Sequence, residues 1–209
     1  MVCSTVQATG LFPISDPMQF REPDARRQQF EAVTLSLLQP LYDTALRLTS
    51  DPEEAADGVQ EAYLRAFRTF DNFRPGTNAR AWMFTILYSV ISNRRKRSRR
   101  EVLTPSLEEL EQRLGVVDQG PERECPGNVE AWGAHWPTEV AAALGELPEA
   151  FRAAVLLVDV QELTHEEAAT VLDCPLGTVQ SRVFRGRRLL FAILESYARQ
   201  AGYSSGKGS

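Results

Sequence analysis

The stretch GTVQSRVFRGRR at residues 177–188 combines small polar residues and arginines at helical spacing. On a wheel of about 100° per residue, Val179, Val183, Gly186 and Leu190 share one side. Another face carries small polar groups and arginines, which can enter the major groove and bind guanine edges or phosphates. The candidate DNA-binding residues are Gly177, Thr178, Gln180, Ser181, Arg182, Arg185 and Arg188. The alternative is an amphipathic helix whose charged face meets only water.

The residues before this stretch predict that it is the second helix of a helix-turn-helix. Thr164 and Glu167 have the spacing of a capping box, which starts a first helix. That helix is expected to end near Asp173, and Pro175 starts the next one almost at once. The second helix of such a motif reads DNA, and Gly186 on its buried side permits close approach to the preceding helices.

Helical periodicity also runs through the N-terminal half. Apolar residues follow a three-to-four spacing from Phe30 to Leu48, and Pro40 inside this run predicts two helices or a kink. Asp51 is a suitable N-cap, followed by a helix with an apolar stripe and a separate polar side. Asn78 is a plausible cap for the run 79–97, which is apolar almost all round and then basic, as is typical of a central bundle helix.

The sequence therefore predicts an all-α protein of two small helical domains joined by a flexible acidic linker, with a helix-turn-helix domain at the C-terminal end. We expect a flexible arm at 1–24, a helical domain at 25–98, an acidic linker at 99–137 in which SLEELEQRL can form a short helix, the helix-turn-helix domain at 138–198 and a disordered tail at 199–209.

Charge is distributed unevenly along the chain. The net charge is −5, yet residues 94–100 read RRKRSRR and residues 101–130 are mainly acidic. Two basic patches on helices are compatible with nucleic acid binding in spite of the acidic total. No apolar run approaches the roughly 20 residues of a membrane span, no export signal is recognisable, and three scattered cysteines predict no disulfide framework. We therefore expect a cytoplasmic protein without membrane insertion.

These motifs resemble the sigma factors of bacterial RNA polymerase, specifically the extracytoplasmic-function group. RLTSDPEEAADGVQEAYLRAF is similar to the family's acidic, Val-Gln-Glu helix, and ARAWMFTILYSVISNRRKR is similar to its Trp-led helix with a basic end. LPEAFRAAVLLVDVQELTHEEAATVLDCPLGTVQSR is similar to its C-terminal helix-turn-helix. The resemblance covers about 26–98 and 138–197, and it implies a non-catalytic promoter-specificity subunit that needs no cofactor or metal.

The resemblance also implies roles for particular residues. In this family the Val-Gln-Glu helix binds the clamp of the largest polymerase subunit, which points to Asp57, Gln60, Glu61, Leu64 and Arg65. The loop and the Trp-led helix open and hold the promoter −10 element, which points to Phe73, Arg74, Asn78, Arg80, Trp82, Tyr88, Asn93, Arg94 and Arg95. The stretch 177–188 corresponds to the helix that binds the −35 element. Anti-sigma proteins commonly silence members of this group, so such a partner is expected.

Some of these assignments have structural alternatives. Trp82 and Tyr88 could instead pack in a helical core, and the polar face around Gln60 could be merely solvated. Gly58 stands where the family usually carries leucine, and Ser89 stands where many members carry asparagine.

Two other functions are weighed against the sigma factor. The first is a transcriptional regulator that acts without polymerase core, against which the Val-Gln-Glu helix and the basic-ended Trp helix argue. The second is a metalloenzyme or metal-sensing switch, for which Cys125, His135, His165 and Cys174 are the material. No pair among them has close ligand spacing, and the sequence contains no glycine-rich nucleophile elbow or phosphate loop.

Overall fold

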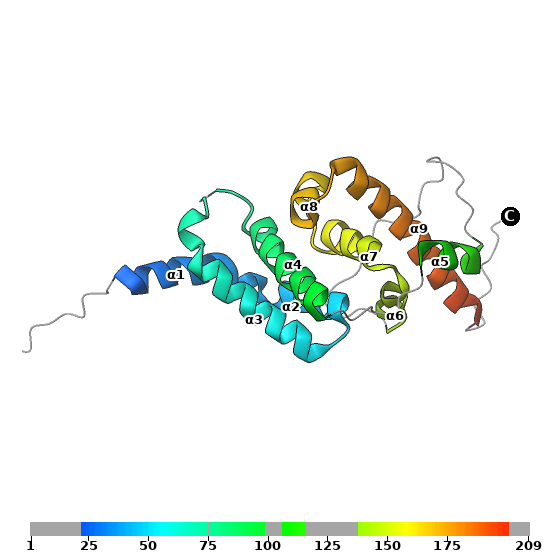
Figure 1. The fold of residues 1–209 in the computed structure, drawn as a ribbon, viewed down its shortest axis with the longest axis horizontal. Coiled ribbons are helices and arrows are strands. Elements are labelled where there is room, and N and C mark those ends of the chain that lie inside the picture. Colours follow the sequence, from blue (N-terminus) through cyan, green and yellow to red (C-terminus); the bar gives the residue numbers. More distant parts are fainter. Residues whose placement is uncertain (1–21, 75, 99–105, 116–137, 201–209) are drawn as a thin grey trace, which may run out of the picture.

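The computed structural model describes residues 22–74, 76–98, 106–115 and 138–200, and every regular element within these ranges is helical. Figure 1 shows two groups of helices side by side. We call the helices within residues 22–98 (α1 to α4) the N-terminal bundle and those within residues 138–200 (α6 to α9) the C-terminal bundle. The all-α fold expected from the sequence is confirmed. The arm before residue 22, the linker outside 106–115 and the tail after residue 200 lie outside the described residues.

The N-terminal bundle consists of α1 (Glu22–Thr34), η1 (Leu35–Leu37), α2 (Leu38–Thr49), α3 (Pro52–Arg68), η2 (Phe70–Asn72) and α4 (Ala79–Ser98). The break predicted around Pro40 is confirmed, because the 3-10 turn η1 separates α1 from α2. Pro40 is the third residue of α2, where its missing N–H costs no intrahelical hydrogen bond. Asp51 caps α3 as predicted, accepting from the backbone N–H groups of Glu53 and Glu54.

The helix α4 is apolar almost all round, and it packs against other helices on more than one side. It packs on α1, α2 and α3 within its own bundle and on α8 of the C-terminal bundle. Met83, Phe84, Leu87 and Val90 are fully buried. Asn78 caps the helix as predicted, since its Oδ1 accepts from the backbone N–H groups of Arg80 and Ala81.

Gly58 lies inside the N-terminal bundle. It is buried on α3, and a Cβ built there would lie 3.6 Å from Cγ1 of Ile91 on α4. The missing side chain at this position therefore acts on the packing of α3 against α4. The solvent-facing side of α3 is formed by other residues.

The remaining elements are α5 (Leu107–Leu114), α6 (Thr138–Glu146), α7 (Glu149–Val155), the π-helical turn η4 (Leu156–Val160), α8 (His165–Leu172) and α9 (Leu176–Gln200). The short helix expected at SLEELEQRL is confirmed as α5, with a capping box between Ser106 and Glu109. Leu110 of α5 is fully buried, and α5 packs on α9.

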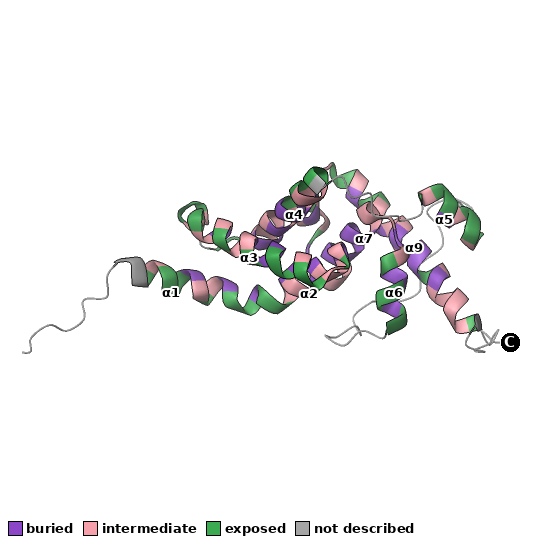
Figure 2. Cartoon of the chain, turned by 60° about the horizontal axis from the view of Figure 1, so that its bottom comes forward, coloured by how far each residue is buried: buried purple, intermediate pink, exposed green. Residues whose placement is uncertain are grey.

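The helix-turn-helix consists of α8 and α9. Thr164 and Glu167 form the predicted capping box, and Asp173 ends α8 with φ +49°, a left-handed conformation. The carbonyl of Pro175 then accepts from the N–H groups of Thr178 and Val179, so α9 begins within a few residues. Figure 2 shows buried positions on the facing sides of α7 and α9, which form the core of this bundle.

Candidate nucleic-acid interface

The helix α9 separates into a packing side and an open side, as the helical wheel predicts. Val179, Val183 and Leu190 are buried against the preceding helices. Gly186 is buried as well, and a Cβ added to it would lie 2.7 Å from Cγ2 of Val155 on α7. Side chains do not tolerate such a distance, so glycine is what allows α9 to approach α7.

The open side of α9 carries the predicted DNA-binding residues. Gly177, Gln180 and Ser181 are exposed near the start of the helix, and Thr178, Arg182, Arg185 and Arg188 are partly exposed. The Arg182 guanidinium lies 3.6 Å from the Cys174 sulfur, and Arg188 lies over the Phe184 ring at 5.7 Å. The exposed N-terminal turn and the arginines along the same side form a surface of the kind that enters a major groove.

Arg187 differs from the other arginines of this helix. Its Nε donates to Asp159 at 3.0 Å, and its Nη2 pairs with the same carboxylate. The Asp159 side chain is only 4% exposed, so this ion pair anchors α9 to η4. Arg187 is not among the predicted DNA-binding residues, and the structure gives it a packing role.

Aromatic side chains gather where η2 and the following loop meet the start of α4. The Phe73 and Trp82 rings lie 4.9 Å apart, and Phe70 stacks on Phe73 at 5.9 Å. Phe70 also meets Phe30 edge-on, which ties this corner to α1. Phe73 and Trp82 are only partly buried, and Arg74 beside them is exposed. Partly exposed rings next to a cation are suited to stacking with unpaired bases.

The outer side of α3 carries the residues predicted to bind polymerase. Asp57 and Gln60 are exposed, and Leu64 is 54% exposed, which is high for a large apolar side chain. Glu61 is held more firmly, because Arg94 of α4 donates to it through Nε at 2.9 Å and Nη2 at 2.8 Å. Arg65 pairs with the same carboxylate. Arg94, a predicted −10 residue, therefore cross-links α3 and α4.

This ion pair predicts a pH-dependent contribution to stability. The Arg94 hydrogen bond lowers the pKa of Glu61, partial burial opposes the shift, and the charge of Arg65 adds to it. A lowered carboxyl pKa stabilises the fold above the unfolded pKa of about 4.3, and this stability is lost as the pH falls through the folded pKa. Glu61→Gln should therefore lose less free energy of unfolding than the wild type between about pH 7 and pH 3.

The wild type and Glu61→Gln should differ in this loss by less than about 1 kcal/mol, because solvent screens an ion pair whose side chains are about a third exposed. Urea titrations at several pH values measure it, with Glu111→Gln on α5 as the control. Identical pH profiles for Glu61→Gln and the wild type would contradict this account.

Four other predicted −10 residues face the C-terminal bundle. The Asn78 Nδ2 donates to Glu167 at 2.7 Å, and the Arg80 Nη1 donates to Gln161 at 3.0 Å. Arg95 pairs with Glu149 at 2.6 Å and donates to the backbone carbonyl of Leu48. Burial raises the pKa of the fourth residue, Tyr88, and the nearby Glu149 carboxylate raises it further.

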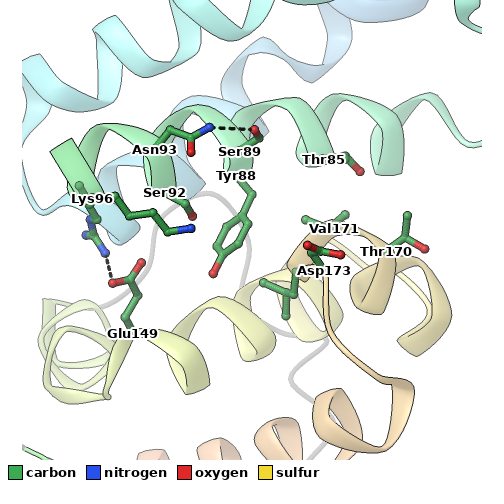
Figure 3. Close-up of a pocket in the computed structure, with 12 residues that line it drawn as sticks. Thr85, Tyr88, Ser89, Ser92, Asn93, Lys96, Glu149, Thr170, Val171 and Asp173 are labelled. Carbon is green, nitrogen blue, oxygen red and sulfur yellow. Dashed lines mark hydrogen bonds and ion pairs between the residues drawn. The ribbon is translucent and has the colours of Figure 1, made fainter.

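A cleft of about 700 Å³ separates part of α4 from α8 (Figure 3). Its α4 wall includes Tyr88, Ser89 and Asn93, and the opposite wall includes Glu149 and Asp173. The Nδ2 of Asn93 donates to the Ser89 hydroxyl at 3.4 Å, so the serine that stands where many members carry asparagine contacts an asparagine one turn further along α4. The bundles thus meet around a partly open space.

The cysteines and histidines considered as metal ligands are not gathered into a site by the residues that the structure describes. Cys125 and His135 lie outside the described residues, His165 begins α8, and Cys174 lies in the turn before α9. Within the described ranges, no three histidine, cysteine or acidic side chains are grouped as a metal site. None of the helices described by the structure combines the length and apolar character needed to cross a bilayer.

Comparison with known families decides to which family the chain belongs. Residues 35–101 match the family model "Sigma-70 region 2", and residues 138–190 match "Sigma-70, region 4". The ECF RNA polymerase sigma factor EcfG of Rhodopseudomonas palustris is 35% identical over 161 residues, covering 77% of this chain and 82% of the relative. The chain belongs to the extracytoplasmic-function sigma factors.

Two further comparisons describe how this sigma factor relates to other members. It is 34% identical to the ECF sigma factor SigE of Mycolicibacterium smegmatis over 79% of its own length, and it spans 61% of that relative. The sigma factor RpoE of Bartonella quintana, solved in complex with the anti-sigma factor NepR, superposes with a TM-score of 0.59 at 30% identity. That match covers 80% of this sigma factor and 98% of the other chain.

Sequence reasoning missed the residues that join the two bundles of this sigma factor. They are Thr44, Glu149, Arg152, Gln161 and Glu167. Arg152 did carry a signal, because it is the single charged residue of the apolar run FRAAVLLV and is only 2% exposed. Buried charges require partners, so its position indicated a polar contact. Glu167 carried no such signal, because its role in the capping box with Thr164 already accounts for a glutamate at this position.

Proposed function

We propose that this sigma factor is an alternative specificity subunit that directs core RNA polymerase to particular promoters and starts transcription there. It acts without a catalytic site of its own, and its work is binding, positioning and opening DNA. The observation that carries the proposal is the presence of both sigma regions, in order, with a corner of partly exposed aromatic rings on the first and a helix with an open, arginine-bearing side on the second. The chain then works in the cytoplasm, where polymerase and promoter are.

The N-terminal bundle supplies two of the proposed surfaces. The clamp of the largest polymerase subunit binds the outer side of α3, where Asp57, Gln60 and Leu64 are exposed. The salt bridge from Arg94 orients Glu61 and Arg65 at the edge of this surface. A hydrophobic side chain flanked by oriented charges is suited to specific protein binding.

The −10 element is proposed to bind at the corner formed by Phe73, Arg74 and Trp82. The rings offer faces for flipped bases, and the Arg74 guanidinium offers a charge for the backbone. Asn78, Arg80, Tyr88, Asn93 and Arg95 extend this surface along α4. The alternative role of Trp82, core packing, is compatible with this use because its ring is only partly buried.

The −35 element is proposed to bind the open side of α9. Gly177, Thr178, Gln180 and Ser181 lie where the helix start would enter the groove, and Arg182, Arg185 and Arg188 follow along the same side. An anti-sigma protein is the proposed regulator, supported by the resemblance to a sigma factor that was solved with one.

Transcription in a reconstituted system tests the proposal. The full chain is added to core polymerase and a library of random promoter sequences, and the transcripts are sequenced. We expect defined start sites with enriched −10 and −35 elements that depend on this chain. A chain that never associates with core, even in excess, would overturn the proposal. DNA binding without core association would instead favour the regulator that acts alone.

Arg182→Ala tests the recognition helix within this system. If Arg182 contacts a base edge, the variant should lose about 1–3 kcal/mol of affinity for the selected −35 element and little for altered elements. Arg199→Ala, near the other end of α9, is the matched control. Binding of holoenzyme to labelled promoters measures the effect. An equal loss on every −35 sequence would mean that Arg182 contacts phosphate and carries no specificity.

A further inference from the structure

We propose that α1 holds the aromatic corner (Phe70, Phe73 and Trp82) in place, and that Arg26 of α1 is the positioning residue. The helix α1 precedes the residues that match the region 2 model, which begin at residue 35. The inference rests on the proposed function, because it treats this corner as the place where flipped −10 bases stack. It adds a helix that fixes the corner from behind without belonging to the proposed DNA surface.

Arg26 joins α1 to the end of α3 and to η2. Its Nε and Nη2 donate to the two carboxylate oxygens of Asp71 at 3.0 and 3.1 Å. Its Nη2 also donates to the Phe67 carbonyl at 2.8 Å, and the guanidinium lies 4.8 Å from the centre of the Phe67 ring. A planar fork that binds both oxygens of one carboxylate fixes direction as well as distance. Arg26 therefore holds residues 67–71 in one orientation relative to α1.

Phe30 lies one turn after Arg26 on the same side of α1, and it continues the contact through aromatic rings. It is 7% exposed, and its ring meets the ring of Phe70 edge-on at 5.3 Å. Phe70 stacks on Phe73, and Phe73 lies against Trp82. Because ring contacts of this kind are directional, the position of α1 determines where the two partly exposed rings of the corner lie.

The C-terminal end of α1 is fixed to α3 as well. Thr34 is fully buried, and its hydroxyl donates to the Phe30 carbonyl at 2.8 Å. The Thr34 carbonyl accepts from the Tyr63 hydroxyl of α3 at 2.7 Å. Burial raises the pKa of Tyr63, so its hydroxyl remains a donor at neutral pH. Arg26, Phe30 and Thr34 thus form one stripe that attaches α1 to its neighbours at successive turns.

The ion pair of Arg26 is suited to positioning more than to global stability. The Asp71 side chain is 75% exposed and the Arg26 side chain is 34% exposed, so solvent screens their charges and the pair contributes little to the free energy of unfolding. The segment that it holds, η2, is a single 3-10 turn of three residues, and Phe73 follows it in extended conformation. So short a turn has few hydrogen bonds of its own, and contacts from α1 decide where Phe73 lies.

The fluorescence of Trp82 tests the proposal without polymerase. The background is the full chain with Trp132→Phe and Trp136→Phe, which leaves Trp82 as the one tryptophan of the sequence. Arg26→Met should shift the Trp82 emission to longer wavelength and increase its quenching by acrylamide, because the Phe73 ring no longer covers the indole. Urea unfolding should give nearly the same midpoint as the background, which shows that the variant is folded.

Matched variants separate positioning from other effects of the substitution. Arg27→Met makes the same chemical change one residue further on, where Arg27 pairs with Glu31 inside α1 at 2.7 Å, and it should leave the Trp82 signal unchanged. Asp71→Asn should reproduce the effect of Arg26→Met. The double variant should be no worse than either single variant, because both substitutions remove the same interaction.

Promoter opening by the holoenzyme is the second measurement. Core polymerase and the full chain are mixed with a promoter selected in the transcription experiment, and unpaired thymines of the −10 element are detected with permanganate. Arg26→Met should lower the opened fraction about fivefold to tenfold, which is the loss expected when one base stacks less well. Arg27→Met should open the promoter like the wild type.

The two measurements together distinguish the explanations. An unchanged Trp82 signal in Arg26→Met would overturn the link between α1 and the aromatic corner. A changed signal with unchanged opening would overturn its role at the promoter. Reduced opening with an unchanged signal would mean that Arg26 contacts DNA or polymerase itself. A wild-type chain that opens no promoter would overturn the proposed function, and the Trp82 signal would still show whether α1 holds the corner.

Discussion

Gly186→Val should destabilise the C-terminal bundle by about 2–3 kcal/mol. The Cβ alone would lie 2.7 Å from Cγ2 of Val155, and the backbone carbonyl of Phe151 is 3.4 Å away. Both neighbours belong to the packed helix α7, so α9 must shift outwards or Val155 must leave its rotamer. Chemical denaturation followed by circular dichroism measures the loss.

Two variants separate the clash from other effects of adding a side chain. Gly145→Val is the matched control, because no atom lies within 4 Å of its added Cβ. Val155→Ala combined with Gly186→Val should recover part of the loss, since it removes the methyl group that clashes. A destabilisation equal to that of Gly145→Val would contradict the close approach of α9 to α7.

Arg152→Met should cost about 3 kcal/mol, because it removes a buried cation and leaves three carbonyls without their donor. Burial lowers the pKa of this guanidinium, and the nearby positive charge of Arg95 lowers it further. The buried guanidinium is therefore stabilised by the carbonyls of Arg47 on α2, of Gly145 on α6 and of Leu147 just after α6. Arg199→Met, exposed on α9, should change the free energy of unfolding by no more than about 0.5 kcal/mol.

Thermal and urea unfolding of both variants measure this difference. Arg152→Lys refines it, because lysine keeps the charge but cannot reach three acceptors with a planar fork. We expect it to recover less than half of the loss. If Arg152→Met has the same free energy of unfolding as the wild type, the buried guanidinium does not stabilise the fold.

The helices and their ends could largely be predicted from the sequence. The cap at Asp51, the capping box of Thr164, the break near Pro40 and the buried side of α9 depend on residues a few positions apart. Such signals are local, so they can be recognised in the sequence without knowledge of the tertiary structure. The π-helical turn η4 was not predicted, because LLVDV carries the same apolar pattern as an ordinary helix.

Which residues belong to the candidate site stays a prediction from the sequence, whereas the orientation of their side chains could not be predicted from it. Arg94 and Arg95 are adjacent in the sequence and were assigned one role, yet Arg94 binds Glu61 of α3 whereas Arg95 binds Glu149 of α7. Neighbours on a helix point about 100° apart, so they face different elements. Which elements those are depends on how the two bundles dock.

By itself, the sequence determined the all-helical fold, the two sigma regions and the split of α9 into a packing side and an open side. Those features follow from periodicity, caps and motifs, which act over a few residues. Only the tertiary structure decided that Gln161 bridges α2 and α4 and that Glu167 holds Asn78. These pairs are 81 to 117 residues apart, and their meeting depends on packing that no local pattern encodes.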